Sequence, residues 1–272
     1  MTAAATTTAP SAPQLTPRVG LGEGLRQTGT LAWRTLVQIR HNPWELSDFS
    51  IQPIMFVLLF TYVFGGAIAG SPAEYLTFAL PGIIVMNMLF VTMYVGLGLN
   101  TDLTKGVFDR LRSLPVARWA PLAGRITADL VKQAWSIALL LGVGTVLGFR
   151  IGTSALALLG AVGLLLVFAL AFSWVSVLVG MLAKDPEKVQ LFGFTALFPI
   201  TFVSNVFVPA ATMPGWLQAF VDVNPVTILA DATRGLMVSG PVAGPVTGSL
   251  LWAAAITVVF APLSVWAFKR RV

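Results

Sequence analysis

The sequence has no cysteine, a single histidine and few charged residues. Only 10% of its 272 residues are charged and 56% are hydrophobic, whereas a soluble domain has about 25% charged residues. So few polar residues cannot cover a water-soluble fold, which excludes a soluble enzyme, a nucleic-acid-binding module and a disordered chain. Without cysteine there is no disulfide, thiolate metal site or cysteine nucleophile. His41 alone argues against a metal centre or a serine–histidine triad, so we expect no metal site and no catalytic residue.

Long stretches without Asp, Glu, Lys or Arg indicate where the chain can cross a membrane. A hydrocarbon core about 30 Å thick requires roughly 20 apolar residues in a helix. Six stretches without these charges occur, at 49–73, 75–101, 133–149, 151–183, 189–221 and 235–268. We therefore predict an all-α integral membrane protein, with residues 48–272 forming a domain of six transmembrane helices and both termini on one side.

The basic residues predict which side that is. If the N-terminus is inside, most Lys and Arg residues between and beyond the stretches are also inside: Arg18, Arg26, Arg34, Arg40, Lys105, Arg110, Arg112, Arg118, Arg125, Lys184, Lys188, Lys269, Arg270 and Arg271. Lys132 lies at an inner helix end, and only Arg150 and Arg234 fall outside. Because cytoplasmic loops carry an excess of Lys and Arg, both termini are expected in the cytoplasm.

The segment before the first crossing has two parts. Residues 1–17 are rich in Ala, Thr and Pro, and we predict a disordered tail. Residues 18–47 are predicted to hold a cytoplasmic amphipathic helix over 21–41 that lies in the membrane interface and ends before Pro43. Its apolar arc contains Leu25, Ala32, Leu36 and Ile39, and its basic arc contains Arg26, Arg34 and Arg40.

The chain shows no energy source of its own. All 11 acidic residues are expected at span ends or in loops, so no carboxylate is placed at membrane depth for a proton relay. None of the five lysines follows a glycine, which excludes the G-x-x-x-x-G-K-[ST] phosphate loop. Uphill transport would therefore need energy from a cytoplasmic partner.

The loop at 101–125 has the features of a docking segment. Phe108, Leu111 and Leu114 recur every three residues, which predicts a short helix that Pro115 ends. This helix either belongs to a solvated basic loop or presents an apolar knob and a basic rim to a soluble protein. The candidate coupling residues are Lys105, Gly106, Phe108, Asp109, Arg110, Leu111, Arg112, Leu114 and Pro115. After it, Arg118, Arg125, Asp129 and Lys132 form one helical stripe, interpreted as the third helix projecting beyond the membrane.

Three motifs resemble the ABC type-2 transporter permeases, in their daunorubicin-resistance-like branch. They are TKGVFDRLRSLPVAR…APLAGR in the 101–125 loop, FVPAATMPGWLQAFVDVNPVTILADATRGLMVSG at 207–240, and FALPGIIV at 78–85. In that family the loop packs on a separate ATP-binding subunit. The chain departs from the family pattern at Thr104, where many relatives carry an acidic residue, although Asp102 lies nearby.

The resemblance implies a subunit with six transmembrane helices in a bacterial plasma membrane. It implies a dimer with an identical or paralogous permease and two ATP-binding subunits, which bind ATP and Mg, so that no cofactor is expected in this chain. The implied activity is export of an amphipathic or hydrophobic molecule, such as a drug, antibiotic or lipid, by alternating access. The alternatives are a polysaccharide or glycolipid exporter of the same family and a membrane scaffold that transports nothing.

Residues 208–238 are too apolar for a free loop, yet prolines interrupt them. We predict two short re-entrant helices, about 214–222 and 226–238, at the outer leaflet as an extracellular gate. Its proposed residues are Pro209, Met213, Pro214, Trp216, Asn224, Pro225 and Arg234. Polar residues within the apolar stretches are candidates for a substrate path or for hydrogen bonds between helices: Asn87, Thr92, Thr201, Ser204 and Asn205.

Overall fold

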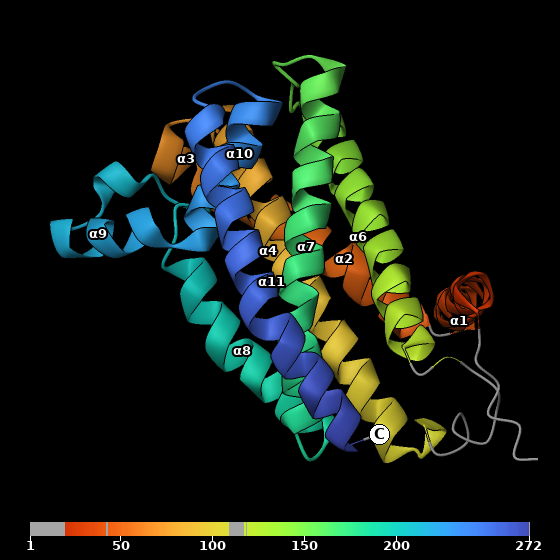
Figure 1. The fold of residues 1–272 in the computed structure, drawn as a ribbon. Coiled ribbons are helices and arrows are strands. Elements are labelled where there is room, and N and C mark those ends of the chain that lie inside the picture. Colours follow the sequence, from red (N-terminus) through yellow and green to blue (C-terminus); the bar gives the residue numbers. More distant parts are fainter. Residues whose placement is uncertain (1–19, 42, 109–116, 118, 272) are drawn as a thin grey trace, which may run out of the picture.

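The computed structural model describes residues 20–41, 43–108, 117 and 119–271. Every regular element in these ranges is helical (Figure 1). The helices are α1 (Leu21–His41), α2 (Pro43–Leu59), α3 (Gly65–Ala69), α4 (Pro72–Thr104), α6 (Ala120–Val146), α7 (Ala155–Leu182), α8 (Pro186–Phe202), α9 (Gly215–Val223), α10 (Pro225–Met237) and α11 (Ala243–Arg271). A π-helical turn, η1 (Phe60–Phe64), joins α2 to α3, and a 3-10 turn, η2 (Ala210–Thr212), precedes α9.

Side-chain caps start several of the long helices. A hydroxyl or carboxylate oxygen accepts a hydrogen bond from a backbone N–H three residues later, which satisfies a donor that the helix itself leaves open. These caps are Ser71 for α4, Ser154 for α7 and Asp185 for α8. The sequence therefore sets where these helices begin independently of the apolar pattern.

The central element of the bundle is α4, which packs against α6, α7, α8 and α10. Its contact with α7 depends on two glycines. A Cβ on Gly96 would lie 2.2 Å from the carbonyl oxygen of Ser176, and a Cβ on Gly180 would lie 2.4 Å from that of Gly96. Neither position therefore has room for a larger residue. The two glycines are what allow the two helix backbones to approach so closely.

Two helices run across the bundle. Figure 1 shows α1 along its axis, at the side of α6, and α9 lying crosswise and standing away from the long helices. Gly124 of α6 admits α1, since a Cβ there would lie 3.0 Å from the carbonyl oxygen of Thr28. Ala32 is buried in this contact, whereas Leu25 and Trp33 are 65% and 68% exposed. Only part of the apolar arc predicted for α1 packs against α6, because Ala32 contacts α6 and Leu25 does not.

Of the basic residues predicted to be inside, Lys105, Arg125, Lys184, Lys188, Lys269, Arg270 and Arg271 lie at one end of the bundle. The end of α4, the start of α6, the α7–α8 turn and the end of α11 share this end, while the turns at 147–154 and 238–242 lie at the opposite end (Figure 1). This arrangement agrees with the predicted topology. The assignment of the basic end to the cytoplasm stays a prediction.

Within the described residues, five helical segments are long and apolar enough to cross a membrane: Ser50–Ala69, Pro72–Thr104, Ala120–Val146, Ala155–Leu182 and Ala243–Arg271. The predicted stretch 189–221 is not one helix, because α8 ends at Phe202 and α9 begins at Gly215. With 17 residues, α8 extends about 25 Å, less than a full hydrocarbon core. A sixth crossing through α8 therefore stays a prediction.

Candidate functional site

A groove of about 200 Å³ lies between α2, α4 and α8. Phenylalanines and methionines contribute seven of its sixteen described lining residues: Phe56, Phe90, Phe194, Phe198, Phe202, Met86 and Met93. Gln52, Asn87 and Gln190 contribute amides, and Tyr94 also lines it. None of its described lining residues carries a charge. Such a surface suits a largely apolar molecule that has a few hydrogen-bonding groups.

Only one of the five polar residues proposed for a substrate path lines this groove. Asn87 does so, and its side-chain Nδ2 donates to Ser136 Oγ of α6 at 2.8 Å. The others make local contacts: Thr92 donates to the Leu89 carbonyl at 2.6 Å, Thr201 to the Leu197 carbonyl at 2.7 Å, and Ser204 to the Thr201 carbonyl at 2.5 Å. The groove therefore gives no support to Thr92, Thr201 or Ser204 as substrate contacts.

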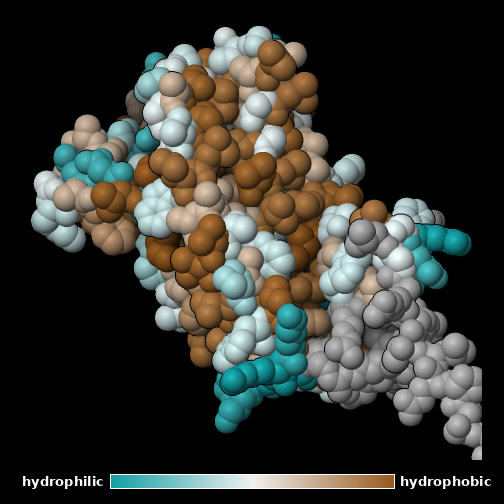
Figure 2. Space-filling view, viewed as in Figure 1, coloured by the Kyte–Doolittle hydropathy of each residue, from teal (hydrophilic) through white to brown (hydrophobic). Residues whose placement is uncertain are grey.

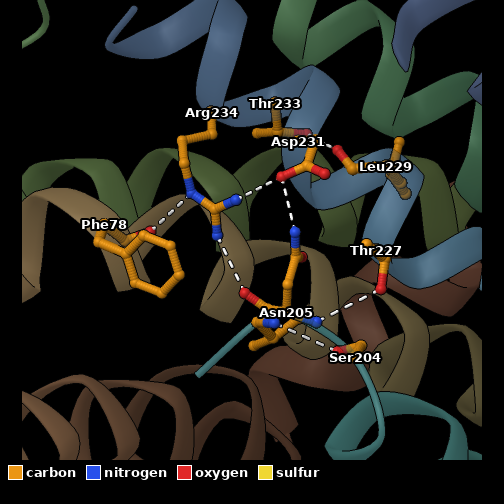
Figure 3. A network of polar contacts seen from close by, with 9 residues as sticks. Phe78, Ser204, Asn205, Thr227, Leu229, Asp231, Thr233 and Arg234 are labelled. Atoms are coloured by element: carbon orange, nitrogen blue, oxygen red, sulfur yellow. Dashed lines mark hydrogen bonds and ion pairs between the residues drawn. The ribbon is translucent and has the colours of Figure 1, made fainter. Parts of the chain in front are cut away.

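Asn205 belongs to a different site, a polar junction around Arg234 (Figure 3). The Arg234 guanidinium donates to the Phe78 carbonyl at 3.0 Å, to the Asn205 carbonyl at 3.2 Å and to Asp231 Oδ1 at 2.6 Å. Asn205 Nδ2 donates to the same Asp231 oxygen at 2.7 Å. Three segments meet here, namely α4, α10 and the turn after α8.

The partners of Arg234 offset part of the cost of burying its charge at this junction. The Arg234 side chain is 15% exposed, and its Cζ lies 4.1 Å from the centroid of the Phe78 ring. Burial lowers the pKa of Arg234, while the charge and hydrogen bond of Asp231 raise it. Because a buried charge is costly without partners, we infer that the three acceptors and the ring together hold this cation in place.

Asn224 links two helices that the sequence predicted separately. Its Oδ1 accepts from the backbone N–H of Val226 at 2.9 Å, which caps the start of α10. Its Nδ2 donates to the carbonyls of Ile200 and Val203, at 2.8 and 2.7 Å, where α8 ends. One amide thus satisfies backbone groups at both helix ends, which gives a physical reason for α8 to stop at Phe202.

The remaining gate residues surround α9. The predicted pair of short helices is present as α9 and α10, with Asn224 between them and Pro225 at the first position of α10. Pro209 precedes η2, while Met213 and Pro214 precede α9. Trp216 is 76% exposed and shares an outward stripe with Phe220 and Val223. The position of these helices in the outer leaflet stays a prediction.

The structure corrects one part of the proposed coupling segment. Phe108 is 6% exposed and packs in a cluster with Leu99, Val177 and Phe268, with its ring centroid 5.7 Å from that of Phe268. It is therefore not the exposed apolar knob that the spacing indicated, because the chain's own helices cover it. Lys105 is exposed and Gly106 adopts a positive φ of 66°. Asp109, Arg110, Leu111, Arg112, Leu114 and Pro115 lie outside the described residues.

Next to this segment, Asp102 Oδ2 and Arg125 Nη1 form an ion pair at 2.5 Å. Gly98 provides the space, because a Cβ there would overlap the Arg125 guanidinium. The pair ties the end of α4 to the start of α6. Asp102, two positions before Thr104, therefore has its ion-pair partner within this chain.

Sequence reasoning placed Asp129 and Lys132 on one helical stripe of α6 but did not show that this stripe is buried. Asp129 and Lys132 are 4% and 9% exposed, within a helix long enough to span a membrane. Gln133 Nε2 donates to the Met88 carbonyl at 2.8 Å, and Ser136 holds Asn87. Asp129 belongs to the part of α6 that the sequence predicts to project beyond the membrane, and its position relative to the membrane stays a prediction. The spacing 129, 132, 133 and 136 already placed these residues on one helix face.

The comparisons with known proteins agree with this architecture. The sequence profile of the ABC-2 type transporter family matches residues 26–238. The chain is 41% identical over 244 residues to a daunorubicin resistance ABC transporter permease protein of Streptomyces coeruleorubidus, covering 90% of this chain and 86% of that protein. It is 30% identical over 220 residues to a probable doxorubicin resistance ABC transporter permease protein of Mycobacterium tuberculosis, covering 79% of this chain and 78% of the relative. A putative transport permease of Cyanophora paradoxa is 25% identical over 218 residues, which are 78% of this chain and 74% of that protein. The chain belongs to the ABC-2 type transporter permease family.

Proposed function

We propose that this chain is the membrane subunit of an ATP-driven exporter for an amphipathic or hydrophobic molecule, such as a drug, antibiotic or lipid. The groove between α2, α4 and α8 carries the proposal, because its aromatic wall and few amides match such a molecule. Two relatives are named for resistance to daunorubicin or doxorubicin, which supports a drug-like substrate. Multiple long apolar helices support a membrane location, and the bacterial relatives named as permeases favour the plasma membrane of a bacterium.

The groove forms the substrate path, with Asn87 as its polar contact on α4. Ser136 fixes the Asn87 amide at 2.8 Å, so the contact is oriented before a substrate arrives and little side-chain entropy is lost on binding. Gln52 and Gln190 provide amides from α2 and α8. Aromatic rings take up the flat apolar part of the substrate.

The Arg234 junction holds the outer end of this path closed. It ties α10 to α4 through the Phe78 carbonyl and to the turn after α8 through Asn205. Since α8 forms one wall of the groove, loosening the junction lets that wall move relative to α4. Alternating access then requires these hydrogen bonds to break and re-form in each cycle.

Energy comes from a separate ATP-binding subunit, which binds ATP and Mg. Its docking site is the segment 101–125, through the exposed Lys105 and the residues from Asp109 to Pro115, with Phe108 as part of the supporting core. The working unit contains two permease chains, identical or paralogous, and two ATP-binding subunits. This chain hydrolyses nothing itself.

The test combines co-purification with a transport measurement. The tagged chain is co-expressed with its ATP-binding subunit, and daunorubicin uptake is measured in inside-out vesicles with ATP. We expect a stable complex and ATP-dependent uptake, which a subunit lacking its phosphate-loop lysine abolishes. A complex that moves a glycolipid but no daunorubicin would favour the glycan alternative, and a chain that binds no ATP-binding subunit would favour the scaffold.

A further inference from the structure

An exposed stripe on α11 ends in a basic cluster at the end of the bundle. Val259, Leu263, Trp266 and Arg270 follow one another at spacings of four, three and four residues, so they share one face of the helix. Val259, Leu263 and Trp266 are 52%, 45% and 50% exposed. The stripe is thus an apolar surface that no described part of the chain covers, and it leads directly to a guanidinium.

The last turn of α11 arranges its charges in a specific way. The Cζ of Arg270 lies 4.0 Å from the centroid of the Trp266 ring, so the aromatic face holds the guanidinium at the end of the stripe. Arg271 turns the other way and donates to the carbonyls of Met181 and Ala183 at the end of α7. Arg271 is therefore engaged with the helix end, whereas Arg270 remains beside the apolar surface.

The contact of Arg271 with Ala183 brings the α7–α8 turn to the same corner. Lys184 follows Ala183 directly and, like Lys269, is accessible to solvent. In this turn Asp185 pairs with Lys188 at 2.9 Å, and Glu187 is the other acidic side chain. In the described part of the chain, the end of α11 and the α7–α8 turn together carry five basic side chains and two acidic ones at this corner. Figure 2 shows hydrophilic side chains gathered at this end, next to a hydrophobic wall.

The dimensions of the stripe match one leaflet of a bilayer. From Val259 to Arg270 the helix rises about 16 Å, and half of a hydrocarbon core is about 15 Å. A phosphate at Arg270 would place an acyl chain along Trp266, Leu263 and Val259. The aromatic ring then lies at the interface depth that tryptophan favours.

We propose that this corner, formed by Lys184, Lys269 and Arg270 with the stripe Val259–Leu263–Trp266, binds an anionic phospholipid. The cluster attracts the negative headgroup, at roughly a fivefold gain in affinity for each basic group near the membrane surface, and the stripe takes the acyl chain. An acidic protein surface would match the basic cluster but leave the apolar stripe without a partner. The lipid is the occupant that uses both features.

The cysteine-free sequence allows a direct test. Leu263→Cys carries a bimane label in the full-length chain, reconstituted into nanodiscs of phosphatidylcholine with a small fraction of brominated phosphatidylglycerol or brominated phosphatidylcholine. We expect brominated phosphatidylglycerol to quench the label at a mole fraction at least fivefold lower than brominated phosphatidylcholine requires. In the triple variant Lys184→Gln, Lys269→Gln and Arg270→Gln, the two lipids should quench equally. A label at Leu159→Cys, which is 67% exposed near the start of α7, should not distinguish the lipids.

Three results would overturn the proposal. The first is no preference at Leu263→Cys, which would also result if a second permease copy covered the stripe. The second is a preference that persists in the triple variant or appears equally at Leu159→Cys. The third is loss of the preference when the ATP-binding subunit is added, which would assign the corner to that protein. Arg150→Gln, which removes an exposed charge at the opposite end of the bundle, is the matched variant and should leave the preference unchanged.

Discussion

Replacing Arg234 with methionine should open the junction between α4, α10 and the turn after α8. The substitution removes the charged donors of the Phe78 and Asn205 carbonyls. Each such hydrogen bond contributes roughly 1.5 kcal/mol or more. Asp231 is 41% exposed, so water can solvate its carboxylate once Arg234 is gone. Loss of the Arg234–Asp231 ion pair therefore adds at most about 1 kcal/mol to the cost. The junction should therefore lose about 3 kcal/mol, which is roughly a 100-fold rise in the population of its open form.

Labelling of a buried cysteine measures this opening. Val206 is fully buried, beneath Gly82, where a Cβ would lie 2.8 Å from the Val206 carbonyl oxygen. In Val206→Cys, the rate of maleimide labelling follows the open population when reclosing is fast. Arg234→Met should raise that rate about 100-fold, and Asp231→Asn by less than about tenfold.

A second buried site shows whether the opening is local. Val177 is fully buried in the cluster around Phe108, and its cysteine variant should label at the same slow rate with and without Arg234→Met. The reasoning is refuted if Val206→Cys labels less than tenfold faster, because the carbonyl contacts would then contribute little. It is also refuted if Val177→Cys accelerates equally, because the whole bundle would then be loosened.

Three further predictions concern topology, the shared cap and the coupling segment. In intact cells an impermeant maleimide should label Arg150→Cys but not Lys105→Cys, and the reverse pattern would contradict the predicted sidedness. Asn224→Ala should lower the stability of the detergent-purified chain by about 2–4 kcal/mol, because it removes a cap and two donors. The stability of Asn224→Ser, which keeps only the cap, should lie between that of Asn224→Ala and that of the unchanged chain. An equal loss of stability in the two variants would argue against the α8 contacts. Phe108→Ala should cost about 3–5 kcal/mol in the isolated chain, whereas unchanged thermal unfolding would mean that its burial contributes little.

The sequence predicted well those features that depend on local chemistry. Five of the six charge-free stretches located long apolar helices in the described part of the chain, because a buried charge in a spanning helix is costly, whereas 189–221 is divided between α8 and α9. Prolines and Asn224 located α9 and α10 to within a residue or two of their ends, since proline cannot continue a helix and asparagine caps one.

Features that depend on contacts between distant segments could not be predicted from the sequence. The spacing of Phe108 indicated an apolar knob but not its partner, which is Phe268, 160 positions further along the chain. The groove between α2, α4 and α8 likewise arises only when three helices meet. Asn87 was identified as a polar residue in an apolar span, yet nothing local distinguished it from Thr92, which bonds within its own helix.

The groove at α8 offers the most direct measurement of the proposed transport path. Gly193 lines the groove, and a Cβ there would lie 3.0 Å from the flexible end of Met93, so Gly193→Phe fills the path. Gly163 on α7 is exposed, and a Cβ there would have no other atom within 4 Å, which makes Gly163→Phe the matched control. ATP-dependent daunorubicin uptake should fall at least tenfold in Gly193→Phe and remain near normal in Gly163→Phe, with both variants still bound to the ATP-binding subunit. Equal uptake by the two variants would contradict the groove as the substrate path.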